Sequence, residues 1–127
     1  MDEYAEWFKS QEVPFVVTES ILDVEEVGER RFIGSALSKD GREIRFFEVL
    51  DAYSASVRQA MIVNRAKFEE TLELYYARDF YLARNKFLEI IKDCPYDEIS
   101  KWYIFECERH LNGEAKEAQW KYLRIEK

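Results

Sequence analysis

The chain has 127 residues, of which 47% are hydrophobic and 16% aromatic, enough to bury a core in one domain or in two small subdomains that share it. Its formal net charge of -7 repels phosphate backbones on average, so we expect no nucleic-acid partner. No stretch is apolar enough to span a membrane, and the acidic N-terminus lacks a signal-peptide apolar run. We therefore expect a cytoplasmic protein with no membrane span.

The residues that usually carry chemistry are sparse. Cys94 and Cys107 lie in helical apolar patterns without CxxC spacing or a histidine cluster, so we predict reduced core cysteines, no metal site and no cofactor. Carboxylate pairs such as Glu69-Glu70 diverge on a helix and do not build an acid–base site. The sequence therefore predicts no catalytic residues.

The first residues alternate between helix and strand signals. Residues 2–10 place three aromatic side chains on one helical face, which suits packing on an apolar surface. Residues 13–18 form a short apolar run with β-branched residues, typical of a buried strand. Ser20 and Gly28 are placed to begin and end a short helix over residues 21–27.

A β-hairpin is the clearest local signal in this half. Residues 31–38 and 42–50 flank Asp40-Gly41, a dipeptide that supplies the positive φ angles of a tight turn. A hairpin is not stable alone in water, so it must pair with the strand at 13–18, with a helix or with another chain. We predict a small antiparallel sheet.

The second half of the chain predicts helices. Two amphipathic runs within residues 68–95 meet at Arg78-Asp79, and each has one apolar stripe. The stripes comprise Phe68, Leu72 and Tyr75 in the first run, and Phe80, Ala83, Phe87, Ile90 or Ile91, and Cys94 in the second. From about Ser54 either one long helix or a helix broken near Asn64 leads into the first run. A further helix is predicted from Asp97 as N-cap to Asn112-Gly113, and a last one runs through Ala115, Ala118, Tyr122 and Ile125.

The small residue Ala83, with Phe87 one turn later and Pro95 after the helix, resembles the tetratricopeptide pattern over a single repeat. Thr71, and Arg78 or Asp79, stand where that family usually has a small residue and a glycine. The predicted fold class is α+β, in which a β portion (residues 1–52) precedes a tetratricopeptide-like helical hairpin with flanking helices (residues 53–127).

Residues 1–52 as a whole resemble the C-terminal end of a class III adenylate/guanylate cyclase domain. The matching motifs, in order, are Val16-Val17-Thr18-Glu19, Ile33-Gly34, Lys39-Asp40-Gly41 and Phe47-Glu48-Val49-Leu50-Asp51. In that family, two metal-holding aspartates, an asparagine and an arginine precede these motifs and would lie upstream of Met1. The resemblance implies one possible phosphate contact, Lys39, beside which Asp40 is inserted.

Three further groups of side chains have a structural and a functional interpretation. Trp7, Trp102 and Trp120 pack between helices or line a pocket, and packing is the commoner case. His110 is expected to complement a helix dipole. The basic residues form a groove for an acidic peptide tail or, as we expect, solvated faces with i, i+4 pairs; they are Arg65, Lys67, Arg78, Arg84 and Lys86.

The sequence favours a non-catalytic regulatory or protein-interaction segment from a cyclase-like protein, in which the helices mediate dimerisation or partner docking. A single repeat cannot cover both of its faces, and the edges of a small sheet favour a homodimer. The alternative is part of an active nucleotidyl cyclase whose metal and transition-state residues lie in a missing N-terminal part.

Overall fold

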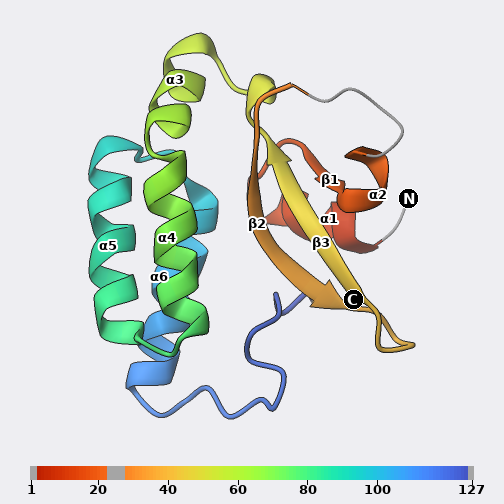
Figure 1. Cartoon of the computed structure of the whole chain (residues 1–127), viewed down its shortest axis with the longest axis vertical. Coiled ribbons are helices and arrows are strands. Elements are labelled where there is room, and N and C mark those ends of the chain that lie inside the picture. Colours follow the sequence, from red (N-terminus) through yellow and green to blue (C-terminus); the bar gives the residue numbers. More distant parts are fainter. Residues whose placement is uncertain (1–2, 23–27, 126–127) are drawn as a thin grey trace.

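The computed structural model describes residues 3–22 and 28–125, and it has an α+β architecture in which a three-stranded antiparallel sheet stands beside a group of helices (Figure 1). The strands are β1 (Val16–Thr18), β2 (Arg30–Leu37) and β3 (Glu43–Val49). The helices are α1 (Glu3–Ser10), α2 (Glu19–Leu22), α3 (Ala55–Val63), α4 (Arg65–Tyr76), α5 (Phe80–Asp93) and α6 (Glu98–Leu111), with a 3₁₀ turn, η1 (Leu50–Ala52), after β3.

The sheet has the order β1-β3-β2, and both pairings are antiparallel. The predicted hairpin is confirmed, with Gly41 at φ 84° in the turn between β2 and β3. The first strand is shorter than the predicted 13–18. The Val13 N–H donates to the Phe8 carbonyl at 3.0 Å, so it terminates α1 rather than joining the sheet, and Pro14 has no N–H to offer.

The short helix predicted over residues 21–27 differs from the structure at its start. Helix α2 begins at Glu19, so Ser20 lies inside the helix and is not its N-cap. The Ser20 hydroxyl instead lies 2.9 Å from that of Thr18. Residues 23–27 of the predicted helix lie outside the described residues.

A β-bulge shapes β2. Phe32 pairs with Phe47 and Gly34 with Phe46, which leaves Ile33 as the extra residue, and Gly34 has a φ of 135°. Because Ile33 is the extra residue, its carbonyl is not paired with β3. It accepts a hydrogen bond from the Tyr103 hydroxyl at 2.7 Å instead. Helix α6 is thereby tied to the edge of the sheet.

Helix α1 covers one face of the sheet (Figure 1). Its Tyr4 and Phe8 rings lie 5.4 and 5.1 Å from the ring of Phe46 on β3. Trp7 reaches across to Trp102 of α6, with ring centroids 5.9 Å apart. The aromatic face predicted for residues 2–10 is confirmed, and it joins the sheet to the helices.

In the helical half, the side chains of the predicted apolar stripes are buried. Phe80 and Ile91 are the exceptions, because they are only partly buried. The chain breaks between α3 and α4 at Asn64, whose side-chain amide donates to the Ala60 carbonyl at 2.9 Å and to Asp93 at 2.7 Å. Asp97 is confirmed as the N-cap of α6, since its carboxylate accepts from the Ser100 N–H at 3.0 Å.

The predicted last helix is wrong. Residues 114–125 contain turns and irregular backbone but no helix, and they run from the end of α6 back to the sheet (Figure 1). The Leu123 N–H donates to the Ser35 carbonyl at 2.7 Å, and Leu123 is buried. Tertiary contacts with the sheet edge outweigh the local apolar spacing in this segment.

The sheet and the helices share one hydrophobic core, which includes Ile33 and Phe46 together with Phe68, Phe87 and Tyr103. The total accessible surface is 7368 Å² for a mass of 15.3 kDa, and a folded monomer of that mass exposes roughly 7,100 Å². The helices of the same chain therefore shield the sheet. Within the described ranges, no helix is both long and apolar enough to cross a bilayer.

Candidate interaction surface

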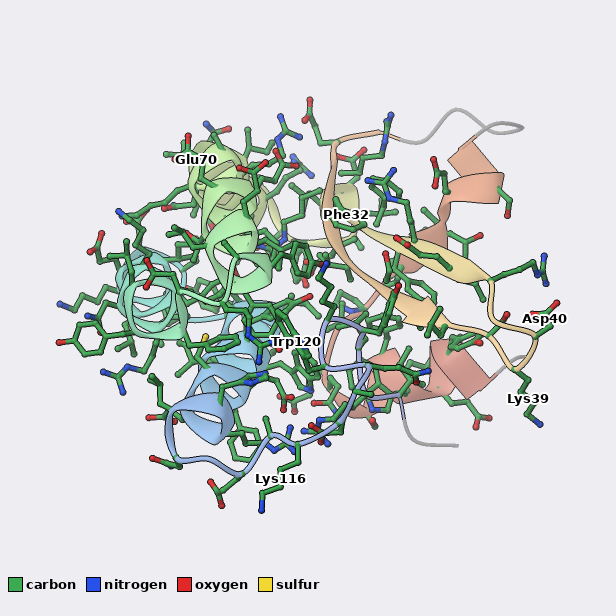
Figure 2. The ribbon with its side chains drawn as sticks, turned by 60° about the horizontal axis from the view of Figure 1, so that its bottom comes forward. Phe32, Lys39, Asp40, Glu70, Lys116 and Trp120 are labelled. Carbon is green, nitrogen blue, oxygen red and sulfur yellow. The ribbon has the colours of Figure 1, made fainter. Side chains whose placement is uncertain are left out.

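Lys39 lies at the exposed tip of the β2–β3 hairpin, and its side chain points away from the rest of the molecule (Figure 2). The neighbouring Asp40 accepts hydrogen bonds from Ser38 and from Arg42. The hydrogen bond from Ser38, supported by the charge of Arg42, lowers the pKa of the Asp40 carboxyl. A phosphate at Lys39 would therefore meet a negative charge beside it, and Arg42, the nearby cation, is engaged by Asp40.

A buried charge network, which the sequence reading missed, joins the sheet to the helices. Arg31 on β2 lies 2.7 Å from Glu48 on β3 and 2.6 Å from Asp97, with all three side chains about 1% exposed. The guanidinium also lies 4.1 Å from the centre of the Phe68 ring, and Tyr53 donates to Glu48. This network is closed to solvent, so it holds the fold together and offers no group to a substrate.

The pKa values reflect this pairing. Burial alone would lower the pKa of Arg31, but the charges of Asp97 and Glu48 outweigh burial and raise it. Burial alone would raise the pKa of Asp97, but the charge and hydrogen bonds of Arg31 lower it. Arg31 and Asp97 are therefore both charged at neutral pH.

A cleft of about 690 Å³ lies between the start of β2, the end of β3 and α4. Its lining residues are Gly28, Glu29, Arg30, Phe47, Asp51, Arg65 and Glu69. Arg65 donates to Glu29 at 2.6 Å and to the Arg30 carbonyl at 3.0 Å. Two arginines face three carboxylates in this cleft, so its charge does not favour a phosphate or another anion.

His110 lies in an aromatic cluster at the end of α6. Its ring stacks on Phe80 at 3.9 Å and meets the edge of Trp120 at 5.2 Å, and Arg78 lies 4.7 Å from the Trp120 ring. Burial lowers the pKa of His110, so the ring is neutral at neutral pH and does not complement the helix dipole as a cation. Together with the Trp7–Trp102 contact, this cluster agrees with the packing interpretation of the tryptophans.

We expect the aromatic cluster to lose stability as the pH falls through the range in which histidine titrates. Because the pKa of His110 is lower in the folded state, the unfolded chain binds the proton first, and stability falls below the unfolded pKa of about 6.5. His110→Phe keeps the stacking and removes the proton site. Urea unfolding at about pH 7.5 and pH 5.5 measures the free energy of unfolding at each pH. Its decrease from the higher to the lower pH should be larger for the wild type than for the variant. Equal losses would exclude His110 as the cause.

The predicted basic residues do not assemble into a groove. Arg65 pairs with Glu29 on the sheet side and Lys67 with Glu89 on α5, each at 2.6 Å. These partners are 36 and 22 residues away in sequence, so they are tertiary pairs and not the expected i, i+4 pairs. Arg84 is in none of these pairs, and its guanidinium carbon lies 5.2 Å from the centre of the Tyr81 ring.

Cys94 and Cys107 are free and buried. Burial raises the pKa of Cys94 to about 11 and that of Cys107 to about 12, so both thiols are protonated and unreactive at neutral pH. Across residues 3–22 and 28–125, no group of three or more His, Cys, Asp or Glu side chains is arranged to hold a metal ion.

An unexplained feature is a set of exposed apolar side chains on α5 and α6, beside a hollow on α5, which together we call the α5–α6 outer groove. Phe87 stacks on Tyr103 and Phe80 on His110, which sets the register of the two helices. The helical period then places Ile91 on the side of α5 and Ile104 on the side of α6 that lie toward the neighbouring helix, and Tyr81, Leu88 and Phe105 farther outward.

The side chains of this groove are unusually exposed for their type. Tyr81 is 62% exposed, Leu88 38%, Phe105 57% and Leu111 43%. A hollow of about 490 Å³ on α5 is lined by Leu88 and Ile91 together with Asn85, Glu89 and Lys92. Figure 1 shows α5 as the helix farthest from the sheet, with no other element over its outer side. Exposed apolar side chains gathered beside polar ones in this way are typical of a protein-binding site.

Comparison of the chain with models of protein families, with curated proteins and with solved structures found no match. The function therefore has to be argued from the side chains and surfaces described above.

Proposed function

We propose that this chain is a non-catalytic interaction segment, derived from the C-terminal end of an adenylate/guanylate cyclase-like protein, which docks a partner protein through the α5–α6 outer groove. The observation that carries the proposal is the row of exposed apolar side chains along the groove, which includes Tyr81, Leu88 and Phe105. By contrast, the charges of Arg31, Glu48 and Asp97 are neutralised inside the fold.

The packing of α4 and α5 supports a tetratricopeptide-like relation. Ala83 is fully buried, as a small residue must be where two helices approach closely. Repeats of that kind stack further helices on their outer surfaces. Here the segment after α6 runs back to the sheet. In the described part of the chain, no further helix packs over the α5–α6 outer groove, where the next helix of a repeat would lie.

The occupant that fits this groove is an amphipathic helix. A groove between two helices receives a third helix through apolar anchors at i, i+3, i+4 and i+7. Tyr81 and Leu88 are seven residues apart on α5, as are Ile104 and Leu111 on α6, so the apolar positions of each helix repeat over two helical turns. A docked helix would contact both repeats along its length.

A peptide of about 18 residues, or five helical turns, tests this docking. It carries a leucine stripe and glutamine elsewhere, and its binding is followed by fluorescence anisotropy. We expect Leu88→Asp to weaken binding roughly tenfold or more, because a charge would be buried against the leucine stripe. Val63→Asp, at an exposed apolar residue of α3, is the matched control and should leave binding unchanged.

Equal binding by both variants would overturn the docking proposal. Sedimentation equilibrium of the free protein provides the second arm of the test. A dimer that Leu88→Asp dissociates would make a second copy the occupant in place of a partner protein. Far-UV circular dichroism establishes that both variants retain their helices.

The alternative function, part of an active nucleotidyl cyclase completed by other residues, is favoured by the exposure of Lys39 at the hairpin tip. Calorimetry with ATP or GTP and Mg²⁺ separates the two functions. The interaction segment gives no binding heat, whereas heat that Lys39→Gln abolishes would favour the alternative.

A further inference from the structure

We infer that the helix bound in the α5–α6 outer groove is acidic along the flank that lies over α5, and that Arg84 and Lys92 bind its carboxylates. This inference rests on the proposed function and adds the chemistry of the partner. It follows from the charges on α5 and from the guanidinium of Arg84, which has no hydrogen-bond partner at its buried Nε.

Arg84 is the central observation. Among the side-chain atoms of the described residues, its Nε is buried yet has no hydrogen-bond partner. Buried polar groups in native proteins are nearly always paired, so such an atom requires an explanation. The guanidinium carbon lies 5.2 Å from the centre of the Tyr81 ring, which holds the group beside the groove but satisfies none of its donors. The buried Nε itself is closed to a partner, but in the described part of the chain no carboxylate pairs with the guanidinium, so its terminal nitrogens are free to donate to a docked carboxylate.

Lys92 extends the positive charge along α5. It lies eight residues after Arg84, or about 12 Å along the helix axis, and it lines the hollow beside Leu88. Of the neighbouring carboxylates of α5, Glu89 is paired with Lys67, whereas Asp93 accepts from the neutral amide of Asn64, which brings no balancing positive charge. Helix α5 still has three cations, Arg84, Lys86 and Lys92, against the single carboxylate of Asp93. The α5 side of the groove therefore has uncompensated positive charge.

The α6 side of the groove has no such excess. Lys101 is paired with Glu98 at 3.1 Å, and Glu108 is exposed one turn from Leu111. Acidic residues on the partner are therefore favoured only along the flank over α5. Carboxylates two turns apart on that flank would match the spacing of Arg84 and Lys92.

The net charge of the whole chain opposes this preference. At -7 the protein repels an acidic peptide at long range, and low salt exaggerates that repulsion. At about 150 mM salt the Debye length is about 8 Å, so contacts within the groove decide the affinity. A preference for acidic peptide under these conditions would have to come from local cations.

The experiment uses the leucine-stripe peptide in two further forms, with glutamates or with lysines along one flank, at about 150 mM salt. We expect the glutamate form to bind roughly tenfold more tightly than the lysine form. Arg84→Gln should remove most of that difference, because the variant keeps the aliphatic stem and a polar end but loses the positive charge and the guanidinium donors. Lys116→Gln, at an exposed lysine of the segment that follows α6 (Figure 2), is the matched control and should preserve the difference.

Equal binding of the glutamate and lysine forms would overturn the inference, as would an equal effect of Arg84→Gln and Lys116→Gln. If the glutamine form still binds and Leu88→Asp weakens it, the docking surface stands without the acidic preference. If the glutamine form does not bind at all, the proposed function fails together with the inference.

Discussion

Arg31→Met is expected to lower the free energy of unfolding by about 3 to 5 kcal/mol, because it leaves the carboxylates of Glu48 and Asp97 buried without their cation. The guanidinium makes hydrogen bonds of 2.9 Å or less to both residues, and no water replaces them in so closed a site. The same change removes the contact between Arg31 and the Phe68 ring. Guanidinium chloride unfolding at about pH 7, where Asp97 is fully ionised, measures the loss.

Arg42→Met is the matched control, since Arg42 also pairs with a carboxylate, that of Asp40, but both side chains are more than half exposed. An exposed pair contributes at most about 1 kcal/mol. If both variants lost the same small amount, Arg31 would not lie in a buried network, and the link between the sheet and the helices would have to be sought elsewhere.

Gly34→Ala is expected to lower the free energy of unfolding by about 3 kcal/mol, for two separate reasons. A residue with a Cβ is strained at a φ of 135°, and such strain costs about 1 to 2 kcal/mol. The added methyl would also lie 2.5 Å from the Tyr103 hydroxyl and 3.2 Å from Leu123. The contact would displace the hydroxyl from the Ile33 carbonyl, with a further loss of about 1 to 2 kcal/mol.

Gly41→Ala separates these two contributions. Gly41 also has a positive φ, 84°, but an added Cβ would meet no atom within 4 Å. The free energy of unfolding of this variant should therefore fall only by the cost of the backbone strain, about 1 to 2 kcal/mol. Thermal or urea unfolding of both variants gives the comparison, and an equal loss would mean that the packing of α6 against the bulge contributes nothing.

The sequence predicts those elements whose signals are local. The Asp40-Gly41 turn specifies its own backbone geometry, and the apolar stripes of α4 and α5 follow the helical period. The N-cap at Asp97 is likewise visible in the sequence, because its hydrogen bond is to a residue three positions away. In each case the atoms that decide the structure are close together in the chain.

Long-range contacts explain what the sequence could not predict. The segment 114–125 has helical apolar spacing, yet its Leu123 binds a strand nearly 90 residues earlier. An arginine in a strand is ordinarily expected at the surface, and only the fold brings Asp97 to Arg31. The bulge at Ile33 depends in the same way on Tyr103, 70 residues later.

The α5–α6 outer groove has a partial sequence signal. Tyr81 and Leu88 are apolar residues outside the buried stripe of α5, and Leu111 lies at the end of α6. Their number suggests a second apolar face, but the sequence does not say whether another element of the chain covers it. The structure leaves it exposed, and the unpaired Nε of Arg84 has no sequence signal at all.

Mapping the docked peptide by nuclear magnetic resonance tests the central claim most directly. The glutamine-flanked peptide is titrated into ¹⁵N-labelled protein, and each backbone amide reports whether its surroundings change. We predict shifts confined to α5 and α6, strongest around Leu88 and Ile104, with the hairpin tip at Lys39 unaffected. Shifts centred on the sheet or on the cleft beside Arg65, with α5 and α6 unchanged, would contradict the claim that the outer groove is where this protein binds its partner.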